Sequence, residues 1–98
     1  MEKIFEQFTG FQWDIGNIDK NLIKHNVENW ESEQIFFNRP LIVLDDPDHS
    51  LSEERWAAFG KTDKDRLIVV IFTKRNNLIR IISARDMNKR EREFYDEE

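Results

Sequence analysis

Two apolar segments joined by a short polar turn constrain the fold of this 98-residue chain more than any other feature. The first covers residues 67–72 (Leu-Ile-Val-Val-Ile-Phe), and the second covers residues 78–84 (Leu-Ile-Arg-Ile-Ile-Ser-Ala). β-Branched and aromatic residues favour pleated, half-buried strands. Between the segments lie Asn76 and Asn77, and asparagine tolerates the positive φ angles that a tight hairpin turn needs at both positions. The sequence therefore predicts an antiparallel hairpin of two buried strands.

Two helices are predicted in the first half of the chain. Asp14 is a favourable N-cap, and apolar or amphipathic residues follow it at helical spacing as far as His25. Asn26 can end this helix in the left-handed conformation. A second helix should cover residues 29–38 and end before Pro40, which cannot continue it. We expect its large apolar side chains to be buried: Trp30, Ile35, Phe36 and Phe37.

The remaining segments complete a small sheet. Apolar patterns predict a first strand near residues 4–13 and further strands over residues 41–44 and 54–60. A short last helix should begin at Met87, with Asp86 as its N-cap. The order of elements predicts one α+β domain spanning all 98 residues. We expect a small, mainly antiparallel sheet with the first two helices on one face and the short C-terminal helix at an edge.

Charge is distributed unevenly along the chain, whose formal net charge is -5. Residues 28–54 contain eight acidic side chains and one arginine, whereas residues 74–92 contain seven basic side chains and two acidic ones. A basic segment in an acidic chain can bind an anionic ligand, and the acidic segment can bind a basic partner. The alternative is a charged surface that only keeps the protein soluble.

The composition argues against several classes of protein. With no cysteine, the chain has neither a disulfide framework nor a thiolate metal site. Its charged beginning does not resemble a signal peptide, and no apolar run is long enough to span a bilayer. We therefore expect a cytoplasmic protein. The acids at Asp45, Asp46 and Asp48 are better explained as a self-capped turn than as a metal site, so no cofactor is expected.

Short motifs along the chain resemble those of the BrnT-type toxins, which are ribonucleases of bacterial type II toxin–antitoxin modules with a RelE-like fold. The motifs occur in the family's order and close to its spacing. The most specific is Arg-Ile-Ile-Ser-Ala-Arg at residues 80–85. The others lie at residues 11–14, 21–27, 45–50, 53–56 and 66–73, with a basic stretch up to Tyr95 behind them. The chain departs from the family in carrying Asn26 instead of a glycine, and in its acidic C-terminus.

The resemblance implies a toxin that blocks translation by cutting RNA without a metal, and that a cognate antitoxin protein keeps inactive. In such a reaction the ribose 2′-hydroxyl attacks the adjacent phosphate, so the protein must stabilise extra negative charge and assist two proton transfers. Arginine suits the first task, and His, Glu, Lys or Tyr suits the second. Contact with DNA is expected only through the antitoxin. A non-catalytic interaction module of the same fold is the alternative function.

Arg80, Arg85 and His25 are the predicted catalytic residues. Strict alternation along a strand places Arg80 and Arg85 on opposite faces, so they can share a site only if Arg85 lies past the strand end or a β-bulge turns it. Either arginine could instead pair with an acid of a neighbouring strand, such as Glu54. His25 could instead be a cap or a packed side chain of its helix. The predicted substrate-binding residues are Lys24, Arg55, Arg90, Arg92 and Tyr95, with base stacking expected at Tyr95. The alternatives are an interaction with the helix dipole for Lys24, local ion pairing for Arg55, and a solvated helix face for the three residues of the last helix.

Overall fold

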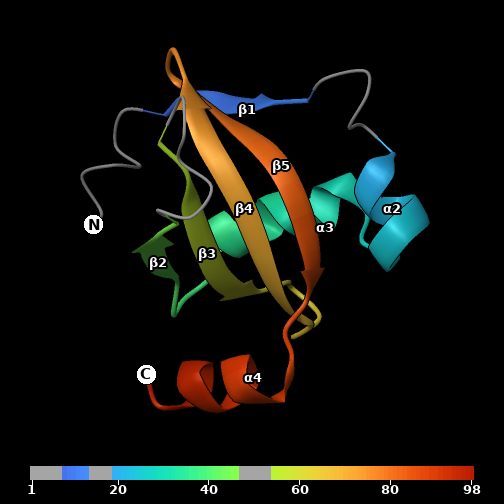
Figure 1. Ribbon diagram of the computed structural model, residues 1–98, viewed down its shortest axis with the longest axis vertical. Helices are drawn as coiled ribbons and strands as arrows, with labels where there is room; N and C mark the ends of the chain where they lie inside the picture. Colours follow the sequence, from blue (N-terminus) through green and yellow to red (C-terminus); the bar gives the residue numbers. More distant parts are fainter. Residues whose placement is uncertain (1–7, 14–18, 47–53) are drawn as a thin grey trace.

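A computed structural model of the chain describes residues 8–13, 19–46 and 54–98. It confirms the predicted α+β class, with one five-stranded sheet (Figure 1) and helices packed on both of its faces. The strands are β1 (Gly10–Gln12), β2 (Ile42–Asp45), β3 (Trp56–Lys61), β4 (Leu67–Arg75) and β5 (Leu78–Asp86). The helices are α2 (Lys20–His25), α3 (Asn29–Gln34), the 3₁₀ helix η1 (Ile35–Phe37) and α4 (Lys89–Asp96). The predicted N-cap Asp14 and the beginning of the predicted first strand lie outside the described residues.

The strands are arranged in the order β1-β5-β4-β3-β2. Strands β2 to β5 pair antiparallel with their neighbours in sequence, and β1 adds to β5 in parallel. The predicted hairpin of β4 and β5 is therefore confirmed. Asn76 has the expected positive φ of 57°, whereas Asn77 is not among the described residues with positive φ. Asn26 also has the predicted left-handed conformation, at the C-terminal end of α2.

A β-bulge at Ile82 determines which residues of β5 share a face. The residues on either side of Ile82 pair with adjacent positions of β4, so Ile82 is an extra residue. Arg80 pairs with Thr73 before the bulge, and Arg85 pairs with Val69 after it. Thr73 and Val69 are four residues apart on a regular strand and therefore lie on the same face. Both arginines consequently lie on this face. A β-bulge was one of the two ways in which the sequence allowed Arg80 and Arg85 to share a site.

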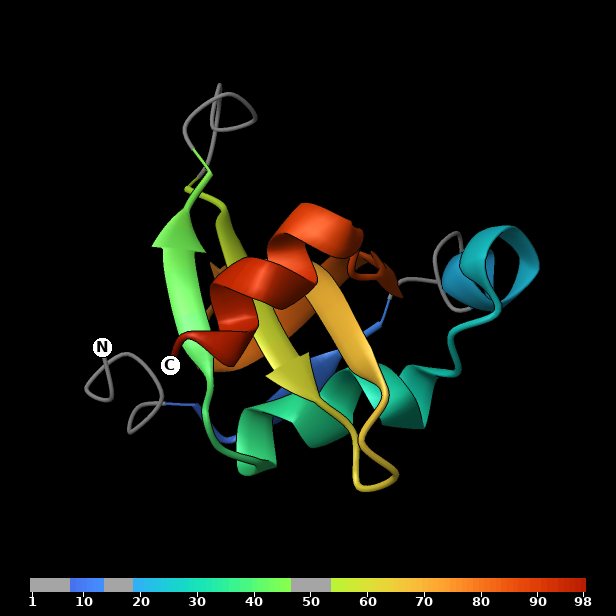
Figure 2. The same ribbon diagram turned by 90° about the horizontal axis from the view of Figure 1, so that it is seen from below.

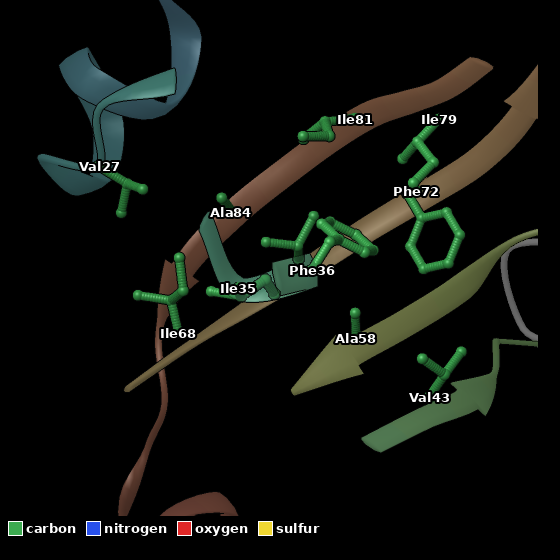
Figure 3. Packing of buried hydrophobic residues seen from close by; sticks show 11 residues of the cluster. Val27, Ile35, Phe36, Val43, Ala58, Ile68, Phe72, Ile79, Ile81 and Ala84 are labelled. Carbon is green, nitrogen blue, oxygen red and sulfur yellow. The ribbon is translucent and has the colours of Figure 1, made fainter. Parts of the chain in front are cut away.

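The main core fills the space between the sheet and the helical segment α3–η1. Figure 3 shows buried side chains of β4 and β5 directed toward Ile35 and Phe36. The rings of Phe36 and Phe72 lie 5.3 Å apart, and Trp56 stacks on Phe72 from β3. These contacts confirm the predicted burial of Ile35 and Phe36.

Two of the residues predicted to be buried lie on the outer side of this helical segment. Trp30 is 50% exposed and Phe37 is 76% exposed, so the prediction was wrong for both. They are seven residues apart, which is nearly two helical turns, and so they point the same way. The inner side of the segment is filled by Ile35 and Phe36, because a helix packed on a sheet can bury only one of its faces.

Helix α4 covers one end of the opposite face of the sheet (Figure 2), rather than lying at an edge as predicted. Phe94 packs edge-on against Phe59 with ring centres 5.5 Å apart. Tyr95 is 5% exposed, and its hydroxyl donates a hydrogen bond to the carbonyl of Pro40 at 2.5 Å. Burial raises the pKa of Tyr95 above its ordinary value. Aromatic packing on β3 therefore fixes this helix on the sheet.

The N-cap of α4 is Asn88, and the predicted cap Asp86 was wrong. The Asn88 side chain accepts from the backbone N–H of Glu91 at 2.9 Å, and the Glu91 carboxylate accepts from the backbone N–H of Asn88 at 2.9 Å. This reciprocal pair is a capping box. Asp86 is instead the last residue of β5, and its carboxylate binds Arg66, with 2.7 Å between Oδ1 and Nε.

Arg66 joins three elements at one corner of the molecule. Besides Asp86, its guanidinium binds the carboxylate of Glu31 in α3 at 3.1 Å and the carbonyl of Asn26 after α2 at 2.8 Å. These carboxylates raise the pKa of Arg66, and Arg66 in turn lowers the pKa of Asp86. The ends of α2 and β5 and the beginning of α3 are thereby fixed relative to one another.

Candidate functional site

A cleft of about 420 Å³ lies on the face of the sheet that carries α4. Its floor is apolar and comes from β3, β4 and β5: Ala57, Phe59, Val69, Ile71 and Ile82. Its polar and charged lining comes from several elements: Lys20, Asp46, Arg55, Ser83, Arg85 and Glu91. Three of these side chains carry positive formal charge and two carry negative charge, so the cleft can hold an anion and also exchange protons.

Arg85 is the predicted site residue with the best-defined surroundings in the cleft. Its Nη1 donates to Oε1 of Glu91 at 2.7 Å, and its Nη2 donates to Oε2 of the same carboxylate at 2.9 Å. The partner therefore comes from the first turn of α4, not from a neighbouring strand. This bidentate pair of hydrogen bonds lowers the pKa of Glu91 and raises the pKa of Arg85. Both groups are held ionised by this contact.

Arg55 and Asp46 lie together where β2 ends and β3 begins. The backbone N–H of Asp46 donates to the carbonyl of Arg55 at 3.0 Å, which extends the pairing of the two strands by one more bond. Along β3, Arg55 alternates with Ala57 and Phe59, and so it shares their face of the sheet. A cation and a carboxylate are thereby brought to the same end of the cleft.

Lys20 reaches the cleft because α2 covers the outer edge of β5. Strand β1 pairs with β5 only as far as Arg80. Beyond it, the buried side chain of Asn21 accepts from the backbone N–H of Ala84 at 3.0 Å, and Lys20 Nζ donates to the carbonyl of Ile82 at 3.5 Å. Lys20 was not predicted as a site residue. Its position depends on how α2 packs on β5, which no local motif indicates.

Two predicted catalytic residues lie outside the lining of the cleft. Arg80 lies on the same face of the sheet as Arg85 but does not line the cleft. It pairs with Thr73 of β4, four residues along that strand from Val69, which pairs with Arg85. The Thr73 hydroxyl donates to the carbonyl of Glu54 at 2.6 Å. His25 is exposed at the C-terminal end of α2, next to the exposed Lys24, whereas Lys20 at the other end of the helix lines the cleft.

The predicted substrate-binding residues of α4 have separate surroundings. Arg90 borders a second hollow, of about 340 Å³, together with Leu44 and Phe94. Arg92 donates from Nη1 to the carbonyl of Met87 at 2.9 Å. The ring of Tyr95 is buried in the packing of α4, so in this conformation it offers no face on which a base can stack.

Within residues 8–13, 19–46 and 54–98, no three His, Asp or Glu side chains are grouped closely enough to hold a metal ion. None of the helices in those ranges has both the length and the apolar character that a membrane crossing requires.

Comparisons with known proteins relate most of this chain to one protein family. Residues 13–91 match a family model described as the ribonuclease toxin, BrnT, of type II toxin–antitoxin systems, and this range contains every residue that lines the cleft. Among solved structures, the 1.1 Å crystal structure of the Brucella abortus ribonuclease toxin BrnT is similar, with a TM-score of 0.61 and 20% sequence identity. The match covers 83% of this chain and 99% of that chain. No curated protein matches the chain.

Proposed function

Because this chain belongs to the family of BrnT ribonuclease toxins of type II toxin–antitoxin systems, we propose that it is a cytoplasmic endoribonuclease that blocks translation by cutting RNA. The observation that carries this proposal is the convergence of Lys20, Arg55 and Arg85 on one cleft. Basic side chains around an apolar floor suit a single-stranded nucleic acid, whose phosphates need cations and whose bases pack on apolar surfaces.

The proposed reaction is an attack within the RNA chain. The ribose 2′-oxygen forms a bond to phosphorus while the bond from phosphorus to the 5′-oxygen of the next nucleotide breaks. The products are a 2′,3′-cyclic phosphate and a 5′-hydroxyl. Negative charge grows on the phosphate oxygens in the transition state, and Arg85 and Arg55 stabilise it. These cations belong to the chain itself, so we propose that the reaction proceeds without a metal.

Asp46 and Lys20 are the proposed proton-transfer groups. Asp46 lies at the β2–β3 side of the cleft and Lys20 lies at the β5 side, with β4 between them. Neighbouring strands are about 4.8 Å apart, so β3 and β5 are separated by about 10 Å. An in-line displacement has its attacking and leaving oxygens on opposite sides of phosphorus. Asp46 therefore accepts the proton of the 2′-hydroxyl, and Lys20 donates a proton to the 5′-oxygen.

The other predicted residues take supporting roles in this proposal. Arg80 contacts a neighbouring phosphate of the RNA, because it shares the face of Arg85. Lys24 and His25 contact the RNA where it leaves the cleft past α2, so His25 is not the proton carrier here. Arg90 and Arg92 are exposed on α4 and contact the RNA backbone in this proposal.

The proposed protein partner is an antitoxin, as expected for a toxin of this family. An antitoxin segment laid over the cleft would keep RNA from Arg55 and Arg85. Any contact with DNA would then be made by the antitoxin. Asp45 and Glu54 are exposed where β2 ends and just before β3 begins, so they are available to basic groups of such a partner.

The proposal is tested by expressing the chain alone and measuring growth arrest and cleavage of RNA by the purified protein. Arg85→Ala should lower the cleavage rate by about 100- to 1,000-fold, as loss of one transition-state donor typically does. Arg75→Ala is the matched control, since Arg75 is exposed at the end of β4 outside the cleft lining. A chelator should leave cleavage unchanged. No cleavage by the wild type would favour a non-catalytic interaction module, and undiminished cleavage by R85A would remove the proposed site.

A further inference from the structure

The hydrogen bonds of Arg85 leave one edge of its guanidinium group available. The group has five N–H bonds. Nη1 uses both of its hydrogens, on Oε1 of Glu91 and on the carbonyl of Asp86 at 3.1 Å, and Nη2 uses one hydrogen on Oε2 of Glu91. In the part of the chain that the structure describes, Nε–H and the second hydrogen of Nη2 have no acceptor.

These two hydrogens form a fork that suits a phosphate. Nε–H and the adjacent Nη2–H point in parallel from one edge of the planar group, and such a pair binds two oxygens of one phosphate. Glu91 binds the other edge. The Arg85 side chain is 43% exposed and lines the cleft, so the available edge can be reached from solvent.

We propose that Glu91 is a positioning residue of the reaction, which holds Arg85 so that its Nε–Nη2 edge faces the phosphate that is cut. This inference rests on the proposed ribonuclease function. Glu91 is itself fixed, because Oε1 also accepts from the backbone N–H of Asn88, and Phe94 packs α4 onto Phe59. The orientation of Arg85 on the sheet is therefore set by a helix that is anchored separately.

Electrostatics gives this proposal a distinctive signature. A carboxylate next to a phosphate site repels the substrate, so its removal alone should tighten RNA binding and leave the catalytic step unharmed. A positioning role predicts a different combination for Glu91→Gln. Binding stays equal or tightens, whereas kcat falls by about 10- to 100-fold because the fork of Arg85 is displaced from the transition state.

The experiment compares the wild type with Glu91→Gln, Glu91→Asp, Asn88→Ala, Arg85→Ala and the double variant R85A/E91Q. The measurements are kcat and KM on a short RNA, and Kd for the same strand as a 2′-O-methyl oligonucleotide, which cannot be cut. N88A is the matched control, because it breaks the same capping box without touching Arg85. We expect kcat of N88A to stay within about twofold of wild type, kcat of E91D to lie between wild type and E91Q, and E91Q to cost nothing further once Arg85 is absent.

Several outcomes would overturn the positioning role while leaving the ribonuclease function intact. These are an unchanged kcat in E91Q, an equal loss of kcat in N88A, or a loss in E91Q that persists in the R85A background. If E91Q does not fold, a wild-type kcat in E91D would refute the proposal in its place. Absence of cleavage by the wild-type protein would instead refute the proposed function, which separates the two failures.

Discussion

Asp46 and Asp45 are neighbouring carboxylates with different surroundings. Asp46 is half-buried and lines the cleft, whereas Asp45 is exposed and does not. If Asp46 accepts the proton of the 2′-hydroxyl, Asp46→Asn should lower kcat by about 100- to 10,000-fold with little change in KM, since the amide keeps the shape of the side chain but cannot act as a base. Cleavage assays that give kcat and KM for the wild type and the variant measure this change.

Asp45→Asn provides the control for this change, because it removes the same charge one residue away. Its kcat should remain within about twofold of wild type, as expected for an exposed substitution outside a site. Equal losses of kcat in the two variants would show that the rate depends on the local negative charge and not on Asp46 as a base. A wild-type rate in D46N would assign the proton transfer to another group.

The separate side chains of the cleft were predictable to different degrees. Arg85 was predicted from the motif at residues 80–85, and Arg55 from its alternation with Ala57 and Phe59 along a predicted strand. Lys20 was not, since its place in the cleft depends on packing of α2 against the edge of β5. For Glu91 a local pattern existed, because Asn88 and Glu91 have the spacing of a capping box. Placing the cap at Asp86 obscured that pattern.

At the scale of elements, α4 is attached to the sheet by a contact that depends on pH. The hydrogen bonds that Glu91 of α4 accepts from Arg85 lower the pKa of Glu91 from the ordinary value of 4.5. A carboxyl group whose folded pKa is depressed binds more protons in the unfolded state. Its stabilising contribution is therefore present above the ordinary pKa and is lost as the pH falls through the folded pKa.

Glu91→Gln should remove this part of the pH dependence. We expect the variant to be less stable than wild type at neutral pH, and the difference to shrink as the pH falls below the ordinary value of 4.5. Denaturant unfolding at several pH values measures this difference in the free energy of unfolding. Asp86 also has a lowered pKa, through Arg66, and the wild type and the variant share that contribution. A stability difference independent of pH would show that the Glu91 charge is not involved.

The elements themselves were largely predictable, but their placement was not. Continuous apolar runs rich in β-branched residues identified β4 and β5, and Asn26 identified the end of α2. The bulge at Ile82 could be named as a possibility, but not located, because its position depends on pairing with β4. Likewise, residues 29–37 are apolar on more than one side, so the sequence could not indicate that Trp30 would face solvent.

At the scale of the whole molecule, an acidic protein presents three cations in one cleft. On a strand short enough to contact only the cleft cations Lys20, Arg55 and Arg85 through its phosphates, binding should release about three counterions. The slope of log K against log salt concentration for a single strand should then be about −2. Binding of the uncut 2′-O-methyl oligonucleotide, measured at several salt concentrations, gives this slope directly. The overall formal charge of -5 predicts no attraction at all, so the result reports on the local arrangement of charge.

Two arginine variants locate the source of this salt dependence. Arg55→Ala should reduce the magnitude of the slope by about 0.7, the value for loss of one phosphate contact on a single strand. Arg75→Ala removes the same charge from the exposed end of β4 and should leave the slope unchanged. Equal changes in the two variants would mean that RNA responds to the total charge of the protein and not to the cleft. A difference confined to R55A would tie binding to the surface formed by β3, β4 and β5, because Arg55 lines the cleft on that surface.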